Sequence, residues 1–248
     1  MAEIDGYIGG IVHDRCFIDG SEVAQIYNGG KKIFDSSISV PTDYLLAYDF
    51  NGNLLDNSVY GNNGAVTSGS ASWDSGAFVF TGTNGIRTNN NVPYSGTNII
   101  TISLWVHNKQ IDNPSNTLIF ETGNNTLGSS NSIGIMIKDD VISILNSQSG
   151  AIKDTRTFNV IDGWNHILLT IDRSESIFSD KVNVFLNGNQ ITLNAISVGI
   201  TTGNLTSTRS NLGYIVSPLG NYFKGKVKKL RIYKRVLSYE EKIALYQE

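Results

Sequence analysis

Cysteine is nearly absent from this chain of 248 residues, because Cys16 is the only one. A single cysteine excludes an intrachain disulfide and a cysteine-based metal cluster. Long apolar runs are also missing, since no stretch approaches the roughly 20 apolar residues that a membrane-spanning helix needs. The first residues are acidic and polar, whereas a secretory signal begins with basic residues and an apolar run. We therefore expect no Sec signal and no membrane insertion.

An excess of one charge is lacking as well. The chain has 19 Lys and Arg against 22 Asp and Glu, for a formal net charge of −3. Nucleic acid is not an expected partner, because wrapping it requires a strongly basic surface. The lysine-rich stretch at residues 224–229 is local, and we interpret it as the solvated face of a strand.

What the chain has in abundance is turn residues. It contains 25 Gly and many Asn and Ser, with 40% hydrophobic and 17% charged residues, which is typical of a globular protein with many turns. Short alternating runs between these turn clusters predict an antiparallel β-sandwich. Sandwiches of about 200–250 residues form single units, so one large β domain is expected.

The C-terminal stretch combines a strand with a helix. Apolar residues alternate with Lys and Arg, as in a strand with one solvated face, at Val227, Leu230, Ile232 and Val236. Ser238 is followed three residues later by Glu241. This spacing is that of a capping box, which predicts that a helix begins there.

Residues 1–43 differ from the rest of the chain. Residues 22–27 and 31–34 are alternating runs joined by Asn28-Gly29-Gly30, a strong hairpin signal. The hairpin resembles those near the ends of phage tail and fibre proteins, where a tyrosine precedes a glycine turn and a lysine-rich return strand. A two-stranded hairpin is marginal alone, so we expect residues 1–43 to form an arm that anchors the protein to a partner chain.

Five further motifs precede the C-terminal strand and helix. They are a strand with an Asp-x-Ser turn, a second strand, an Ile-Ser-Leu-Trp-Val strand, a Trp-Asn-His segment and a strand with an Asn-Gly turn, at residues 44–64, 77–82, 100–106, 162–172 and 182–189. In content and order these motifs resemble laminin-G-like domains of the concanavalin A-like superfamily. The resemblance implies an all-β, two-sheet antiparallel jelly-roll sandwich over residues 44–248, with a short C-terminal helix.

Catalysis is not expected. A retaining glycosidase of this superfamily needs two carboxylates about 5 Å apart, alternating along one strand. The only Glu-x-Asp motif is Glu3-Ile4-Asp5, outside the domain, and Asp139-Asp140 is better explained as a solvated turn. His166 stands where the resembled family carries a histidine, and we interpret its role as structural hydrogen bonding. The alternative is a glycoside hydrolase with degenerate acids, for which Glu121 and Asp172 are the residues to test.

A calcium site is a second candidate. Asp49, Asp56 and Asn57 would supply the hard oxygen ligands that calcium prefers, and relatives of the resembled family often hold calcium near the rim. Many of those relatives carry an Asp where Lys228 and Lys229 stand here. A lysine at that position would repel calcium or pair with Asp49 or Asp56. The alternative role of Asp56 and Asn57 is turn capping.

Glycan binding would need an exposed aromatic platform, because sugars present apolar faces. The candidate platforms are Trp73, Tyr94, Trp105 and Tyr222. On the strand at residues 100–106, Ile102 and Leu104 share one face, so Trp105 takes the other face and lies either on the outer surface or beneath a loop. The alternative for each of these rings is ordinary packing.

We therefore expect a non-catalytic recognition or adhesion module, lectin-like and able to bind a host surface glycan. The expected setting is a virion surface, as a phage tail, fibre or capsid-decoration protein, because a domain of extracellular type without disulfides fits a particle assembled in the cytosol. The partners would be other virion proteins, and an oligomer is expected. The alternative is a secreted or cell-surface carbohydrate-binding domain of a bacterium.

Overall fold

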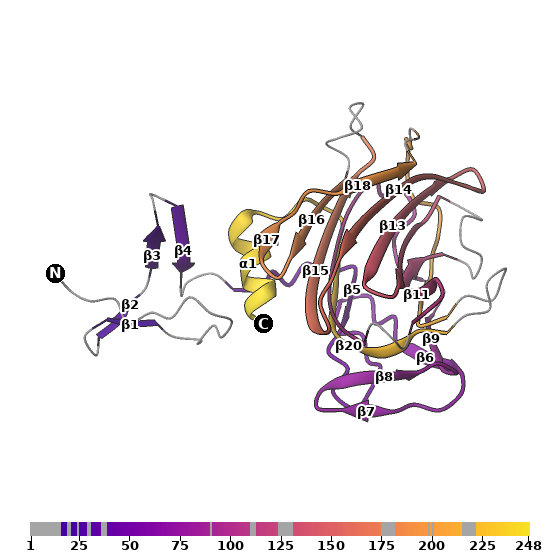
Figure 1. Ribbon diagram of the computed structural model, residues 1–248, viewed down its shortest axis with the longest axis horizontal. Coiled ribbons are helices and arrows are strands. Elements are labelled where there is room, and N and C mark those ends of the chain that lie inside the picture. The colour runs from indigo at the N-terminus through magenta and orange to yellow at the C-terminus, as the bar shows by residue number, and fades with distance from the viewer. Residues whose placement is uncertain are drawn as a thin grey trace. The chain divides into compact units, whose positions relative to one another are not determined.

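The computed structural model describes residues 16–18, 21–23, 25–28, 31–35, 39–89, 91–109, 113–123, 131–174, 182–197, 199, 201–214 and 222–248. It divides into two units, Met1–Pro41 with Ser238–Glu248, and Thr42–Leu237. Figure 1 labels the helix and most of the strands of both units.

Two short hairpins make up the described N-terminal strands. β1 (Cys16–Ile18) pairs with β2 (Ser21–Val23), and β3 (Gln25–Asn28) pairs with β4 (Lys31–Asp35), both antiparallel. The predicted hairpin at residues 22–27 and 31–34 is confirmed for β3 and β4. It is wrong for residues 22 and 23, which pair with β1 instead.

The helix of the same unit, α1 (Tyr239–Gln247), begins where the capping box predicted. The Ser238 hydroxyl accepts a hydrogen bond from the Glu241 backbone N–H at 3.2 Å, and the Glu241 carboxylate accepts one from the Ser238 backbone N–H at 2.8 Å. Two N–H groups that the helix cannot satisfy internally are paired in this way.

The larger unit is a sandwich whose described residues form two eight-stranded sheets. The first, here called the β10 sheet, has the order β17 (Asn189–Gln190), β16 (Val182–Leu186), β15 (Gly163–Asp172), β10 (Ile99–Asn108), β20 (Lys224–Tyr233), β8 (Ala77–Thr81) and β7 (Trp73–Asp74), with β5 (Leu46–Tyr48) beside β20. The second, the β12 sheet, has the order β18 (Asn194–Ser197), β14 (Ala151–Asn159), β13 (Val141–Gln148), β12 (Ile133–Lys138), β11 (Thr117–Thr122), β19 (Ser210–Leu212), β9 (Gly85–Thr88) and β6 (Gly64–Ser68).

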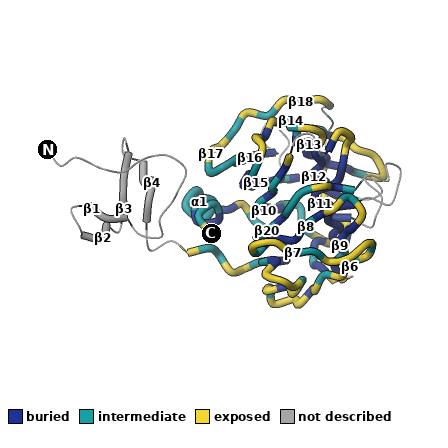
Figure 2. The backbone as a smooth tube through the Cα atoms, turned by 60° about the horizontal axis from the view of Figure 1, so that its bottom comes forward, coloured by how far each residue is buried: buried dark blue, intermediate teal, exposed yellow. Residues whose placement is uncertain are grey.

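The core lies between these sheets because each long strand turns one apolar row inward. Strands β10, β11, β12 and β15 are buried over most of their length (Figure 2). On β10 the inward row includes Ile102, Leu104 and Val106, all of which belong to the buried core. The predicted all-β sandwich is confirmed, and the strands predicted at residues 77–82, 100–106 and 182–189 correspond to β8, β10 and β16.

A bulge in β20 explains the uneven spacing of its apolar residues. Opposite β10, the register shifts between the pairs Ser103–Arg231 and Trp105–Lys228, and Lys229 adopts a positive φ of 53°. One extra residue therefore enters β20, and both Val227 and Leu230 can face the core. The expectation that Val236 continues this strand is wrong, since it lies beyond β20 and is 48% exposed.

Candidate functional site

The outer face of the β10 sheet collects aromatic and basic side chains. Strand alternation puts them on this face, opposite the inward row of β10. The register places His107 opposite Trp164 and Lys226, and Trp105 opposite His166 and Lys228. Three strands that are distant in sequence, β10, β15 and β20, therefore contribute to one surface.

Two tryptophans and a lysine form the centre of this surface, here called the tryptophan–lysine cluster (Trp105, Trp164 and Lys228). The Lys228 ammonium nitrogen lies 4.5 Å from the ring centroid of Trp164 and 5.3 Å from that of Trp105. Both distances suit cation–π attraction. The His107 ring meets Trp164 edge-on, with centroids 5.2 Å apart. Burial lowers the pKa of Lys228 from its ordinary value.

Beside the cluster is an open hollow of about 300 Å³ in the same face. Four of the side chains that line it carry or can carry a positive charge, namely His107, Lys109, Lys224 and Lys226. We call this site the basic hollow. The hollow and the tryptophan–lysine cluster are adjacent, because His107 lines the hollow and its ring contacts Trp164 of the cluster.

Two glycines shape the basic hollow. A Cβ at Gly82, whose φ is +85°, would come within 2.8 Å of the Lys224 Cε, so the lysine stem lies flat over this glycine. A Cβ at Gly225 would meet the His107 carbonyl oxygen at 2.4 Å, so a side chain there would force β20 away from β10. Gly225 therefore requires a residue without a Cβ, and the positive φ of Gly82 favours glycine there.

The electrostatics of the hollow are positive. Lys226 forms an ion pair with Asp74, and its hydrogen bond lowers the pKa of that carboxyl group. Burial lowers the pKa of His107, and the positive charges of Lys226 and Lys109 lower it further. His107 is therefore predominantly neutral at pH 7, and it loses its proton partly because the surrounding lysines disfavour another cation.

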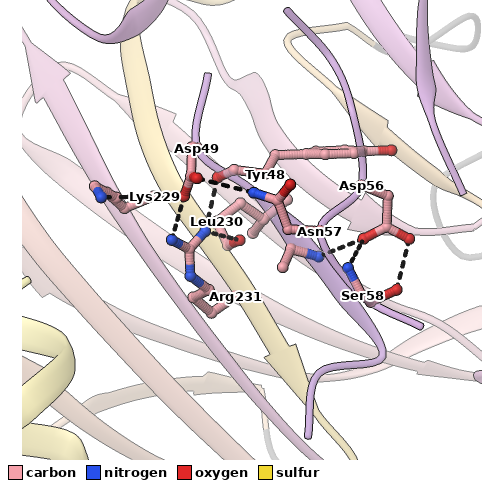
Figure 3. A network of polar contacts seen from close by, with 9 residues as sticks. Tyr48, Asp49, Asp56, Asn57, Ser58, Lys229, Leu230 and Arg231 are labelled. Carbon is pink, nitrogen blue, oxygen red and sulfur yellow. Dashed lines mark hydrogen bonds and ion pairs between the residues drawn. The ribbon is translucent and has the colours of Figure 1, made fainter. Parts of the chain in front are cut away.

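The calcium candidates form a hydrogen-bonded network instead (Figure 3). The Asp49 carboxylate pairs with the guanidinium of Arg231 and has the Lys229 ammonium at 4.0 Å. It also accepts a hydrogen bond from the Asn57 amide nitrogen at 2.8 Å. Arg231 is only 3% exposed, and it donates a further hydrogen bond to the Tyr48 carbonyl at 3.0 Å. Two cations therefore occupy the surroundings of Asp49.

Asp56 acts as the organiser of the turn after β5. Its carboxylate accepts hydrogen bonds from the Ala47 and Ser58 backbone N–H groups, both at 2.9 Å, from the Ser58 hydroxyl at 2.6 Å and from the Asn62 N–H at 2.7 Å. With Asp56 saturated and Asp49 paired with cations, these residues do not fit a calcium ion. Lys229 and Arg231 pair with Asp49, whereas the sequence had also suggested Lys228. Elsewhere in the described chain, no group of three His, Cys, Asp or Glu could hold a metal.

The four predicted platforms have different positions. The prediction of Tyr94 as a platform is wrong, because this side chain is 0% exposed. Its hydroxyl lies 2.5 Å from the Ser210 hydroxyl, and burial raises the pKa of Tyr94. Trp73 packs against the core, with its ring edge-on to Phe78 at a centroid distance of 5.1 Å. Tyr222 stacks on Tyr214 with an interplanar angle of 12°. Only Trp105 joins the aromatic surface of the β10 sheet.

Trp164 was missed as a platform. It is partly exposed and lies at the centre of the aromatic surface, although the sequence motif around it indicated only a structural segment. The sequence signal for this position was strand alternation in β15, which puts Trp164 and His166 on one face and Ile167 on the opposite, inward face. The structural role predicted for His166 is confirmed, since its Nε2 lies 2.8 Å from the Ser103 hydroxyl oxygen. Burial lowers the pKa of His166 to about 3.

Glu121 is a buried acid on the outer row of the β12 sheet. It is 0% exposed, and burial raises its pKa to about 7 against the opposing effect of the Asn211 amide. Asn211 in turn accepts a hydrogen bond from the Arg87 guanidinium at 3.3 Å. Asp172 caps a turn, where it accepts hydrogen bonds from the Ser174 N–H at 2.9 Å and hydroxyl at 2.5 Å. These two acids belong to different sheets, so the structure does not bring them into one row.

Comparisons with solved structures support the fold assignment. The binding domain of botulinum neurotoxin serotype D/C VPI 5993 aligns with a TM-score of 0.63 and 16% identity, over 84% of this chain and 52% of the other. The binding domain of botulinum neurotoxin DC in complex with SialylT gives 0.65 and 16%, over 84% and 52%. A structure of botulinum neurotoxin type C, whose cell entry is dependent upon interaction with two ganglioside molecules, gives 0.64 and 15%, over 82% and 50%.

The chain therefore spans about half the length of these neurotoxin domains, and at such identities the likeness concerns the fold. No curated protein matches the sequence. A family model, described as the concanavalin A-like lectin/glucanases superfamily, matches residues 80–241, which is more than half of the chain. With the two antiparallel sheets observed here, this match shows that the chain belongs to the concanavalin A-like lectin and glucanase superfamily.

Proposed function

We propose that this protein is a non-catalytic recognition module that binds a glycan on the outer face of the β10 sheet. The observation that carries this proposal is the partly exposed Trp164, held beside Lys228 and next to the basic hollow. A sugar ring has apolar C–H faces that stack on an aromatic ring and polar edges that need hydrogen-bond donors. Trp164 supplies the first, and the hollow supplies the second.

The aromatic surface is held rigidly enough for recognition. Trp164 stands on β15, one of the central strands of its sheet, and pairs directly with His107 of β10. Lys228 contacts the ring from a third strand. A platform fixed on paired strands loses little conformational entropy when a ligand binds, so more of the contact energy appears as affinity.

The structural relatives are consistent with a recognition role. They are binding domains, and those with 0.65 TM-scores were solved with SialylT and with rat synaptotagmin II. One ligand there is named as SialylT and the other is a protein, so this architecture serves recognition of more than one kind of partner. The proposal for this chain rests on its own surface residues, because the identities are low.

The setting we propose is a virion surface, as a component of a phage tail or fibre or as a capsid-decoration protein. Residues 1–43 would anchor the protein to other virion proteins in an oligomer, while the sandwich presents the β10 sheet to a host glycan. The two short hairpins in this segment support the proposal, because isolated two-stranded hairpins gain stability by pairing with other chains. Among the described residues, no helix is long and apolar enough to cross a membrane.

A glycoside hydrolase is the second candidate, and Glu121 is the observation that favours it. A pKa of about 7 suits the general acid of a glycosidase. The mechanism also needs a second carboxylate at about 5 Å for retention or about 6.5–9.5 Å for inversion. In the described part of the β12 sheet, the neighbours of Glu121 across the strands are Asn211 and Gly134, which are not acids.

The proposal is tested by glycan-array binding of the full chain, followed by Trp164→Ala. We expect a bound glycan whose affinity falls about tenfold in Trp164→Ala, equivalent to about 1.4 kcal/mol. Tyr60→Ala is the matched control, because Tyr60 is 45% exposed and lies in a turn outside the β10 sheet. Trp164→Phe, which keeps a ring, should retain most of the binding. A chain that binds no glycan, or a Trp164→Ala variant with unchanged affinity, would contradict the proposal.

A separate assay distinguishes the hydrolase. The full chain is incubated with the bound polysaccharide, and release of reducing ends is measured. We expect no release above that of Glu121→Gln. Digestion that disappears in Glu121→Gln or Asp172→Asn would instead establish an enzyme.

A further inference from the structure

The basic hollow has more positive charge than the binding of an uncharged sugar requires. Of its four basic side chains, Lys226 is paired with Asp74. Within the part of the chain that the structure describes, the ammonium groups of Lys109 and Lys224 form no ion pair with a carboxylate. Both lysines are exposed at the mouth of the hollow. Unpaired cations around one concave site attract an anion.

From this arrangement we infer that the ligand is an acidic saccharide, whose carboxylate, phosphate or sulfate group enters the basic hollow while a sugar ring lies on Trp164. The inference rests on the proposed function and names its ligand class. The contact that joins the two parts is the edge-on packing of His107 against Trp164 at 5.2 Å, since His107 also lines the hollow. One ligand can therefore reach both.

Lys224 and Lys226 are partly ordered before any ligand arrives. The stem of Lys224 lies over Gly82, where a Cβ would approach its Cγ to 2.9 Å, and this restricts the side chain. Lys226 is held by Asp74. Ordering a free lysine side chain opposes binding through lost conformational entropy, so this restriction favours binding.

The size of the hollow fits the same class of ligand. Its volume of about 300 Å³ is at the lower end of the range for small-molecule sites. That volume accommodates an anionic substituent with part of its sugar. The aromatic platform beside the hollow favours a saccharide over a phosphopeptide, because a pyranose ring stacks on tryptophan through its apolar face.

The test compares saccharide probes of equal length with the full chain by isothermal titration calorimetry. The probes are a sulfated, a phosphorylated and a uronic-acid oligosaccharide and an uncharged glucan oligosaccharide. We expect at least one acidic probe to bind at least tenfold more tightly than the uncharged one, with an advantage that shrinks as salt rises from 50 to 300 mM. The acidic arms separate the three sources of the negative charge.

The variants assign the effect to the hollow. The double substitution Lys109→Gln and Lys224→Gln should reduce acidic-probe affinity at least tenfold and uncharged-probe affinity by much less, because glutamine keeps a hydrogen-bond donor and loses only the charge. The control is Lys138→Gln with Lys153→Gln, which removes the same charge from exposed lysines on β12 and β14 of the other sheet. The control should bind as the unaltered protein does. Equal losses in the two double variants would overturn the inference.

The outcomes also separate the two proposals. Binding of the uncharged probe that depends on Trp164, without any advantage for an acidic probe, would overturn the acidic class and leave glycan recognition in place. Failure of every saccharide to bind would overturn both. A phosphopeptide that binds through Lys109 and Lys224 while all saccharides fail would show that the hollow serves a different class of ligand.

Discussion

The ring of His107 lies edge-on to Trp164, with centroids 5.2 Å apart, and the same histidine lines the basic hollow. A titratable group therefore stands at the junction between the platform and the cationic site. Its neighbours are mostly cations, Lys226 and Lys109, with the carboxylate of Asp162 as the opposing charge. Any anion that enters the hollow changes this balance.

Binding of an acidic saccharide should strengthen as the pH falls. In the free protein, burial and the charges of Lys226 and Lys109 lower the pKa of His107, so the ring is predominantly neutral at pH 7. A bound anion offsets the lysine charges and raises the pKa of His107, so the complex holds more protons than the free protein. Affinity therefore rises as the pH falls between the two pKa values, by at most about tenfold per pH unit for one proton.

Calorimetric titrations between pH 5 and 8 measure this dependence. His107→Gln should bind with a flatter pH profile, and an unchanged slope in that variant would rule out His107 as the group responsible. His166 is not an alternative source, since burial lowers its pKa to about 3, below this pH range.

Removing Asp49 should destabilise the fold much more than removing Asp43. Asp49→Ala removes the carboxylate that pairs with the guanidinium of Arg231, which is 3% exposed, and taking one partner from a buried ion pair costs about 3 kcal/mol. Asp43 pairs with Arg235 at 2.7 Å in a much more exposed position. Losing such a surface pair costs about 0–1 kcal/mol. Urea unfolding of the two alanine variants measures the difference in free energy.

Equal losses of unfolding free energy in the two variants would show that the burial of Arg231 does not increase the cost of removing its ion pair. The same samples test the metal hypothesis. Because Arg231 and Lys229 already neutralise Asp49, added calcium should leave the melting temperature of the unaltered protein unchanged. A calcium-dependent rise that disappears in Asp49→Ala would restore the calcium site.

Glu121→Gln should stabilise the protein above pH 7 and have little effect at pH 4.5. The folded protein holds the Glu121 proton up to a pKa of about 7, whereas the unfolded chain releases it near 4.5. Stability therefore falls as the pH rises through this window, because the folded state binds more protons there than the unfolded state. A shift of this size corresponds to about 3 kcal/mol when complete.

Urea unfolding at pH 4.5 and pH 8 compares Glu121→Gln with the unaltered chain. Asp139→Asn is the control, because Asp139 is an exposed turn residue with a φ of 52° that Asn tolerates. Parallel pH profiles for the unaltered chain and Glu121→Gln would show that Glu121 ionises freely in the folded protein.

Local sequence signals predicted much of the fold. The capping box of Ser238 and Glu241 was sufficient to locate the start of α1, because both of its hydrogen bonds lie within three residues. The Asn187-Gly188 turn was likewise recognisable, since both residues adopt positive φ values of 49° and 78°. Alternation along β10 put Trp105 on the outer face. In each case the interactions that decide the structure are close in sequence.

The site was harder to predict because it is assembled from distant segments. Nothing near Trp164 in the sequence indicates that Lys228 lies over its ring, since the two residues meet only when β15 and β20 flank β10. Tyr94 illustrates the opposite error. Its aromatic character suggested a platform, but its burial depends on a packing environment that includes Ser210, more than a hundred positions away. The different positions of Lys228, beside the tryptophans, and Lys229, beside Asp49, depend on the bulge in β20, which strand alternation alone does not predict.

The bulge at Lys229 divides β20 into two halves with different freedom to change. Before the bulge, Lys224 and Lys226 line the hollow and Lys228 contacts the tryptophans, so the residues at these positions would be constrained by the ligand. After the bulge, Arg231 pairs with Asp49 and donates a hydrogen bond to the Tyr48 carbonyl, so this position is constrained by the stability of the fold. Related proteins could therefore exchange ligands by replacing residues in the first half of a single strand, while the second half keeps the sandwich closed.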